Sequence, residues 1–210
     1  MLLKHMARTG LLLAMFAVIG TALVAFTYTG TKDDIANSQR EALLKSLNVL
    51  VGNLGYDNQL YNDRIQITDE RWLGTTQAMT VYRARKQGQP VAAIIETIAP
   101  DGYSGRIKLL VAIEYDGTLA GVRVLTHKET PGLGDAIEAE RSDWILGFNG
   151  KSLSNPAKKG WAVKKDGGKF DQFTGATITP RAVVQAVHKS LQFFRLQRAE
   201  LFRSASGDNT

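Results

Sequence analysis

The chain has 210 residues, which is enough for one domain of ordinary size with an appendage and too few for a second large domain. Its 44% hydrophobic and 22% charged residues are typical of a globular protein. The net charge is +6, but the basic residues are scattered and no basic helix carries interleaved aromatic residues, so we do not expect nucleic-acid binding. The absence of cysteine excludes disulfides, thiolate catalysis and cysteine-ligated metal clusters, so any redox chemistry needs another carrier.

The one long apolar run covers residues 11–29 and contains no charge. This length predicts a helix that crosses a membrane once. Lys4 and Arg8 precede the run and residues 32–34 carry mixed charge, so we expect the N-terminal tail in the cytoplasm and the rest of the chain outside, which in a bacterium means the periplasm. A cleaved secretory signal is the alternative, and the lack of an Ala-x-Ala site after the run favours a retained anchor.

The next segment, residues 31–76, is expected to connect the anchor to the main domain. Residues 32–50 carry apolar side chains at helical spacing, which predicts a membrane-proximal helix. Residues 51–76 mix Asn and Asp with Leu, Tyr and Ile, a pattern typical of loops with short strands.

Two β-hairpins are predicted next. Residues 79–85 and 91–98 alternate in polarity on either side of residues 87–90, which contain a glycine and a proline and break the pattern. Residues 107–115 and 118–125 flank an Asp-Gly turn. A glycine-rich connector, residues 100–105, lies between the hairpins.

Helices are predicted at residues 137–148 and 180–202, and a short strand at 161–163. Together with the hairpins they predict an α+β fold in which antiparallel strands pack under segregated helices. We therefore divide the chain into an anchor with its tail, a connector, a main domain and a polar, disordered tail, at residues 1–30, 31–76, 77–203 and 204–210.

The stretch from Asp171 to Arg181 precedes and begins the last helix. We expect Thr179 to be the N-cap and Pro180 the first helical residue. Unpaired N–H groups at a helix start stabilise an anion, so this turn is a place to hold a phosphate near Thr177. Local physics does not decide whether the hydroxyl of Thr174, Thr177 or Thr179 would be used.

Other chemistry is weaker in this sequence. His127 and Glu129, two residues apart at a strand end, form a possible metal pair, but no further histidine lies nearby. The hydroxyls of Ser104 and of the threonine turn, residues 174–177, are not placed in the nucleophile-elbow or triad pattern of a hydrolase. Residues 132–134 do not satisfy a dinucleotide fingerprint, although the glycines and proline of this loop allow close approach to a ligand.

The motif Asp171-x-x-Thr174-Gly175-Ala176-Thr177 resembles the flavinylation motif of the FMN-binding domain family, in which the phosphate of FMN is esterified to the last threonine. The anchor and residues 101–105, 129–134 and 161–168 extend the resemblance to the G subunits of Rnf/Rsx electron transport complexes. The motif shows no departure from the family pattern.

This resemblance implies a flavoprotein subunit of a complex in the inner membrane that couples electron transfer to ion translocation, with the flavin domain on the periplasmic side. It implies that the other Rnf/Rsx subunits are partners, that a flavin transferase attaches the FMN, and that the chain is not a complete enzyme by itself. In the implied FMN site Thr177 carries the covalent bond, and its neighbours in the turn are Thr174, Gly175, Ala176 and Ile178. The glycine loop, residues 130–134, provides a wall through Thr130, Leu133 and Gly134. Two lysines lie near the phosphate, Lys164 and Lys165.

Two alternatives stay open from the sequence. The C subunit of the sodium-translocating NADH:quinone reductase carries a similar motif and a similar Pro-Gly-Leu-Gly loop. From a different class, the chain could be a membrane-tethered binding module without redox activity.

Overall fold

The computed structural model describes the backbone of residues 2–203 and the side chains of residues 4–203. The tail predicted at residues 204–210 lies outside these residues. Two compact units are present, one extending to Leu44 and one starting at Lys45, and each is described by itself.

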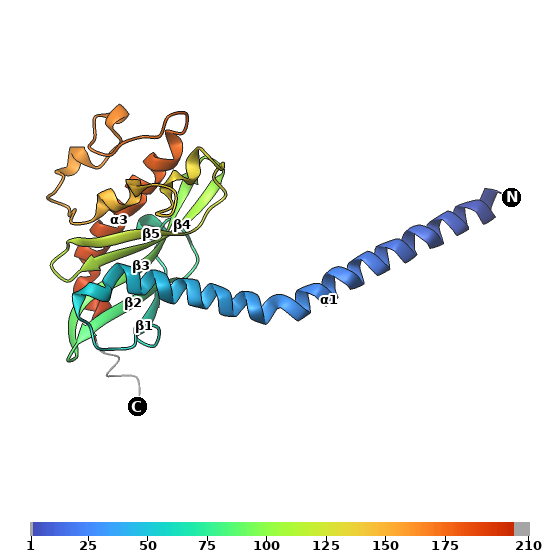
Figure 1. Ribbon diagram of the computed structural model, residues 1–210, viewed down its shortest axis with the longest axis horizontal. Coiled ribbons are helices and arrows are strands. Elements are labelled where there is room, and N and C mark those ends of the chain that lie inside the picture. The colour runs from blue at the N-terminus through green and yellow to red at the C-terminus, as the bar shows by residue number, and fades with distance from the viewer. Residues whose placement is uncertain (1, 204–210) are drawn as a thin grey trace. The chain divides into compact units, whose positions relative to one another are not determined.

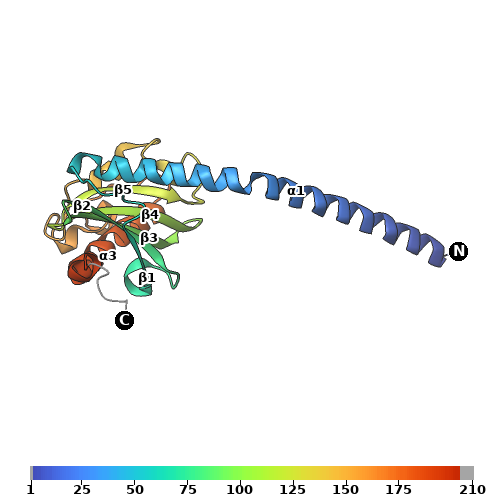
Figure 2. The same ribbon diagram turned by 90° about the horizontal axis from the view of Figure 1, so that it is seen from below.

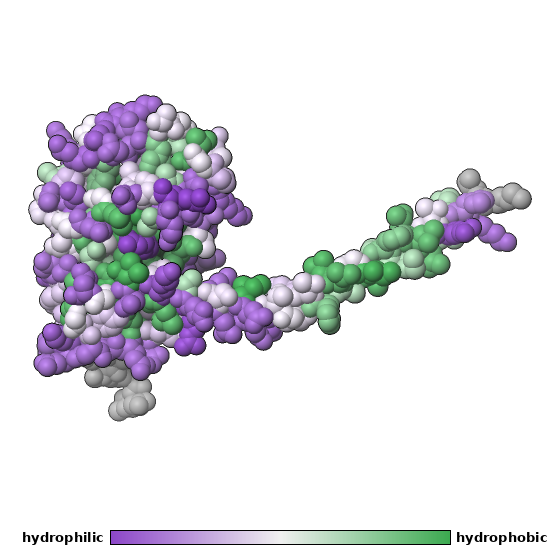
Figure 3. Space-filling model, viewed as in Figure 1, coloured by the Kyte–Doolittle hydropathy of each residue, from purple (hydrophilic) through white to green (hydrophobic). Residues whose placement is uncertain are grey.

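The first unit is the N-terminal part of helix α1, Leu2–Val51. Its most apolar window has a mean hydropathy of 2.3, and α1 is the one helix among the described residues that is long and apolar enough to cross a membrane. Figure 3 shows hydrophobic residues along this part of α1, where Phe26 is 82% exposed. Such a surface is stable in lipid, and the predicted apolar helix is confirmed. The helix predicted at residues 32–50 belongs to the same continuous α1.

The second unit is built on one antiparallel sheet whose five strands follow in chain order (Figure 1). The sheet is a simple meander in which each strand pairs with the next along the chain. Its strands are β1 Arg64–Ile67, β2 Met79–Lys86, β3 Gln89–Gly102, β4 Gly105–Glu114 and β5 Leu119–Thr126.

Both predicted hairpins are present, and a third joins them. The connector at residues 100–105 is the end of β3, a two-residue turn at Tyr103 and Ser104, and the start of β4. Gly102 pairs with Gly105 across this turn, and Gly105 has a φ of 120°, which a residue with a side chain rarely adopts. The two hairpins are therefore consecutive parts of one sheet.

Helices cover both faces of the sheet (Figure 2). Helix α3, Ile178–Leu201, packs its apolar stripe against one face, with Val183, Val187 and Phe194 fully or almost fully buried. The last turn of α1 packs on the other face through Leu47, Leu50 and Val51. A Cβ on Gly121 would lie 2.8 Å from Leu50 Cδ2, so the absence of a side chain there lets α1 approach β5. This arrangement confirms the α+β class.

The helix predicted at residues 137–148 is wrong. Two 3₁₀ segments replace it, η2 Gly134–Ile137 and η3 Asp143–Phe148. Ser142 between them is extended, with φ −161° and ψ 149°, and its hydroxyl accepts the Trp144 backbone N–H at 3.2 Å. This serine starts a new segment instead of continuing a helix.

The strand predicted at residues 161–163 is reduced to a single bridge between Val163 and Phe170. Short 3₁₀ turns precede and follow it, η4 Lys158–Gly160 and η5 Lys164–Asp166. Trp161 instead packs its ring against Phe170 with centroids 5.2 Å apart, so side-chain packing holds this irregular segment. The remaining short elements are η1 Gly52–Leu54 and α2 Glu70–Leu73.

Candidate functional site

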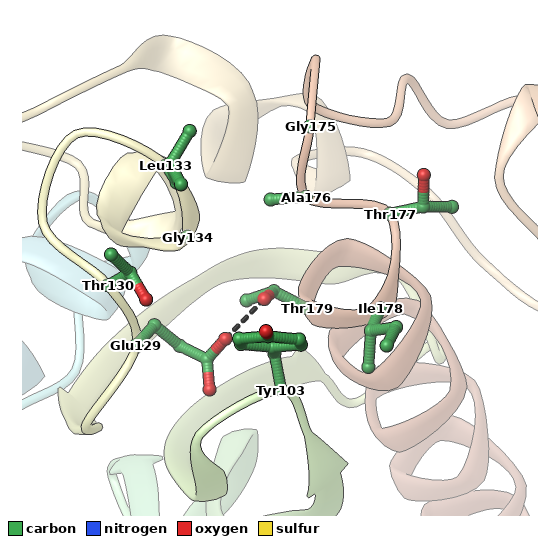
Figure 4. A pocket seen from close by; sticks show the side chains of 10 residues that line it. All are labelled: Tyr103, Glu129, Thr130, Leu133, Gly134, Gly175, Ala176, Thr177, Ile178 and Thr179. Atoms are coloured by element: carbon green, nitrogen blue, oxygen red, sulfur yellow. Dashed lines mark hydrogen bonds between the residues drawn. The ribbon is translucent and has the colours of Figure 1, made fainter.

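A pocket of about 370 Å³ opens where the β3–β4 turn, the loop after β5 and the start of α3 meet (Figure 4). The β3–β4 turn contributes one aromatic ring, the loop after β5 contributes one wall, and the threonine turn with the first residues of α3 contributes the other. The lining residues are Tyr103, Glu129, Thr130, Leu133, Gly134, Gly175, Ala176, Thr177, Ile178 and Thr179.

The threonine turn reverses sharply before α3. Gly175 has a φ of 80°, in the region that favours glycine, and the Ala176 N–H donates to the Phe173 carbonyl at 3.2 Å. A Cβ on Gly175 would lie 3.7 Å from Leu133 Cδ2, so the turn and the glycine loop approach each other closely. The chain then enters α3 at Ile178, directly after Thr177.

Thr179 is not the N-cap, contrary to the prediction. The N-cap is Thr177, which has helical dihedral angles, φ −81° and ψ −28°, and makes no side-chain cap hydrogen bond. Pro180 is therefore the third helical residue. Proline is tolerated throughout the first helical turn, because the N–H groups there have no intrahelical acceptor, so its position does not identify the exact start of a helix.

The two threonines at this helix start have different surroundings. Thr179 is fully buried and donates its hydroxyl hydrogen bond to Glu129 Oε2. Thr177 is half-buried, and its hydroxyl has no hydrogen bond to any of residues 4–203. In Figure 4 the Thr177 hydroxyl points away from the Glu129 carboxylate, at the rim of the pocket. Thr177 therefore presents a free hydroxyl beside the positive end of α3.

Glu129 forms the floor of the pocket. It is 4% exposed, and its Oε1 accepts the Ser104 backbone N–H at 2.9 Å. Its own backbone N–H donates to His127 Nδ1 at 3.0 Å, and His127 Nε2 lies 2.8 Å from Glu138 Oε1. The side chains of these two residues therefore have different surroundings, since the Glu129 carboxylate lines the pocket and the His127 ring contacts Glu138. No cluster of three or more metal-ligating side chains occurs among the described residues.

The exposed side chains and the helix start that line the pocket suit a flat, anionic ligand. Tyr103, 69% exposed, and Leu133, 46% exposed, offer ring and aliphatic surfaces, which pack well on an aromatic ligand. The backbone N–H groups of Ile178 and Thr179 are the first of α3, directly after Thr177, and such groups have no intrahelical acceptor.

Comparison with known proteins identifies the pocket-bearing region and the N-terminal helix separately. The sequence model of the FMN-binding domain matches residues 102–192, a range that includes every residue lining the pocket. The model of the RnfG N-terminal region matches residues 1–50.

Whole-chain relatives are named as the G subunit of an ion-translocating oxidoreductase complex. One from Pseudoalteromonas atlantica is 48% identical over 95% of this chain and 93% of its own length. One from Aliivibrio fischeri is 50% identical over 95% of both chains, and one from Pseudomonas aeruginosa is 50% identical over 94% of this chain and 92% of its own. This chain belongs to that G-subunit family. The resemblance drawn from the motif and the glycine loop is thereby confirmed.

In this member of the family the structure brings together most of the predicted site residues. Those that line the pocket are Thr177, Gly175, Ala176, Ile178, Thr130, Leu133 and Gly134. Thr174 is exposed and outside the lining, although it belongs to the same turn.

Lys164 and Lys165 also lie outside the lining of the pocket. Lys164 Nζ lies 2.6 Å from Asp171 Oδ1, and the Lys165 backbone N–H donates to Gln172 Oε1 at 3.2 Å. The following residue, Asp166, pairs with Arg181 of α3 at 2.6 Å. The hydrogen bond from Arg181 lowers the pKa of the Asp166 carboxyl below its ordinary 3.8. Residues 164–166 therefore contact the segment before the threonine turn and the first turn of α3, outside the pocket.

Sequence reasoning missed three lining residues: Tyr103, Glu129 as part of a cofactor wall, and Thr179 as a buried donor. The glycines around Tyr103 were a usable signal. A Cβ on Gly102 would lie 2.3 Å from the Gly105 carbonyl oxygen and 2.9 Å from Glu129 Oε1, so this turn is pressed against the pocket floor. No local pattern indicates that Glu129 and Thr179, fifty residues apart, are in contact.

Proposed function

We propose that this pocket holds FMN, joined through its phosphate to the Thr177 hydroxyl, and that the domain relays electrons within a membrane complex. The observation that carries the proposal is the free hydroxyl of Thr177 at the pocket rim, directly before the N-terminus of α3. The match to the FMN-binding domain and the names of the relatives support the cofactor and the complex.

The structure supports Thr177 over the other two threonines of the turn. A hydroxyl that carries FMN in this pocket must be accessible without being needed to satisfy a buried group, and it must line the pocket. Thr179 is buried and donates to Glu129, and Thr174 does not line the pocket. Thr177 meets both conditions.

The residues present fit FMN in charge and shape. The N–H groups at the start of α3 would hold the phosphate, because they carry partial positive charge and lack intrahelical acceptors. Leu133 and Tyr103 would pack on the ring system. When bound, FMN supplies reversible electron transfer, which no side chain of this cysteine-free protein supplies.

Attachment of FMN to Thr177 needs a separate flavin transferase. Activation of a hydroxyl requires a base within hydrogen-bonding reach, and none of residues 4–203 contacts the Thr177 hydroxyl in this way. Its half-buried position at the rim leaves it accessible to such an enzyme.

We further propose that the domain carrying this site lies on the periplasmic side of the inner membrane. The apolar part of α1 supports a single span, and Lys4 and Arg8 before it support a cytoplasmic N-terminus. In this arrangement the domain would exchange electrons with other subunits of the complex, and the relatives, named as subunits of an ion-translocating oxidoreductase complex, support such partners.

The first prediction tests the attachment site. The full chain is produced with a flavin transferase as wild type, Thr177→Ala and Thr174→Ala, and each is measured by intact mass and by flavin fluorescence after denaturing electrophoresis. Wild type and Thr174→Ala should carry the mass of one FMN less one water, and Thr177→Ala should carry none. Covalent flavin in Thr177→Ala would refute the assignment. Wild type without flavin, when isolated from its native host, would favour a binding module without redox activity.

A further inference from the structure

Glu129 is a buried carboxylate that joins the three segments around the pocket. Its Oε1 accepts the Ser104 N–H from the β3–β4 turn, and its Oε2 accepts the Thr179 hydroxyl from α3. Glu129 itself belongs to the loop after β5. One side chain therefore fixes the walls relative to one another while it lines the cavity (Figure 4).

The packing around Glu129 leaves room for a carboxylate and little else. A Cβ on Gly134 would lie 2.8 Å from Glu129 Cβ and 3.0 Å from its Oε2. A Cβ on Gly102 would lie 2.9 Å from Glu129 Oε1. All three distances are shorter than ordinary van der Waals contact, so two glycines on different segments accommodate this one side chain.

The charge of Glu129 lacks a cationic partner. The other buried glutamate among the described residues, Glu96, has its Oε2 3.0 Å from Lys108 Nζ. No ion pair joins Glu129 to a lysine, arginine or histidine among residues 45–203, and its partners are two neutral donors. A carboxylate held in this way keeps its negative field, because burial limits screening by water.

We propose that the charge of Glu129 lowers the reduction potential of the flavin held in this pocket. The inference rests on the proposed function. Reduction adds negative charge to a flavin unless protons follow, and a fixed negative charge in the wall disfavours that gain. The hydrogen bonds from Ser104 and Thr179 partly offset the charge and hold it in place. Glu129 is thus a positioning and electrostatic residue, which makes the reduced flavin a stronger electron donor.

The second prediction is tested on the flavin-loaded full chain by a spectroelectrochemical titration. Glu129→Gln keeps the size of the side chain and an oxygen that can accept the Ser104 N–H, and it removes the charge. Glu140→Gln is the matched control, because Glu140 is exposed and does not line the pocket. Flavin content is first measured by intact mass. The midpoint potential of Glu129→Gln should shift to a more positive value, and that of Glu140→Gln should equal wild type.

The possible outcomes separate this inference from the proposed function. Wild type without covalent flavin would refute the proposed function. A loaded Glu129→Gln variant with the wild-type potential, or a lower one, would overturn the inference alone. If Glu129→Gln does not fold, Thr179→Val replaces it, since loss of the hydroxyl donor leaves the carboxylate charge less offset. Its potential should then be lower than wild type, and an equal or higher value would overturn the inference.

Discussion

The rim and the floor of the pocket use the same residue type in opposite ways. Thr177 at the rim and Thr179 at the floor are two residues apart on one helix start, yet the Thr177 hydroxyl is free and the Thr179 hydroxyl is bound to Glu129. At the floor, Glu129 and Thr179 are buried and hydrogen-bonded to each other. Gly102 and Gly134 lie so close to Glu129 that a side chain on either would not fit without a shift. Thr177 at the rim is only half-buried, and its hydroxyl makes no cap hydrogen bond. The fold therefore depends on the floor, and the rim is available for chemistry.

The third prediction, with the largest expected effect on stability, compares the two threonines directly. Thr179→Val should lower the free energy of unfolding by about 1.5–3 kcal/mol, because the buried Glu129 carboxylate loses a donor. Thr177→Val should change it by less than about 0.5 kcal/mol, because no side-chain hydrogen bond is lost. Urea unfolding of the two variants measures both values. Equal losses would show that the rim and the floor do not differ as described.

The fourth prediction extends the comparison to glycine. Gly134→Ala should cost about 1–2 kcal/mol, because the new methyl group would press on Glu129 Cβ at 2.8 Å and on the Thr179 hydroxyl at 3.1 Å. Gly147→Ala is the control, since Gly147 is exposed, lies in a 3₁₀ segment and has open space around its Cβ position. Thermal unfolding of both variants gives the result. A Gly134→Ala variant as stable as Gly147→Ala would mean that the floor can rearrange freely.

The fifth prediction concerns the outer side of the threonine turn and has the smallest expected effect. Arg181 lowers the pKa of Asp166, so this exposed ion pair stabilises the folded state above pH 3.8, and the contribution is lost as the pH falls through the lowered pKa. At pH values above 3.8, Asp166→Asn should therefore be slightly less stable to unfolding than wild type, because exposed pairs contribute little. Well below pH 3.8 the two proteins should be equally stable. Unfolding curves across this pH range provide the measurement. A loss as large as that of Thr179→Val would contradict the distinction between buried and exposed contacts.

Much of the architecture follows from short-range patterns. The apolar run at residues 11–29 has the length and composition of a membrane helix, and alternating polarity identified both hairpins. Prediction was wrong where local cues compete. Residues 137–148 have helical spacing, but the Ser142 hydroxyl binds the Trp144 N–H and divides the segment in two. Pro180 suggested a helix start two residues too late, because proline fits any position of the first turn.

The sequence by itself determined the apolar N-terminal helix, the two β-hairpins, and the two loops that carry the family pattern, since each depends on residues close together in the chain. The motif also marked Thr177, although local physics did not separate it from Thr174 and Thr179. The tertiary structure alone decided that Thr179 serves Glu129 and that Thr177 stays free. The reason is physical: burial and hydrogen-bond partners are set by residues fifty positions away, and only packing brings them into contact.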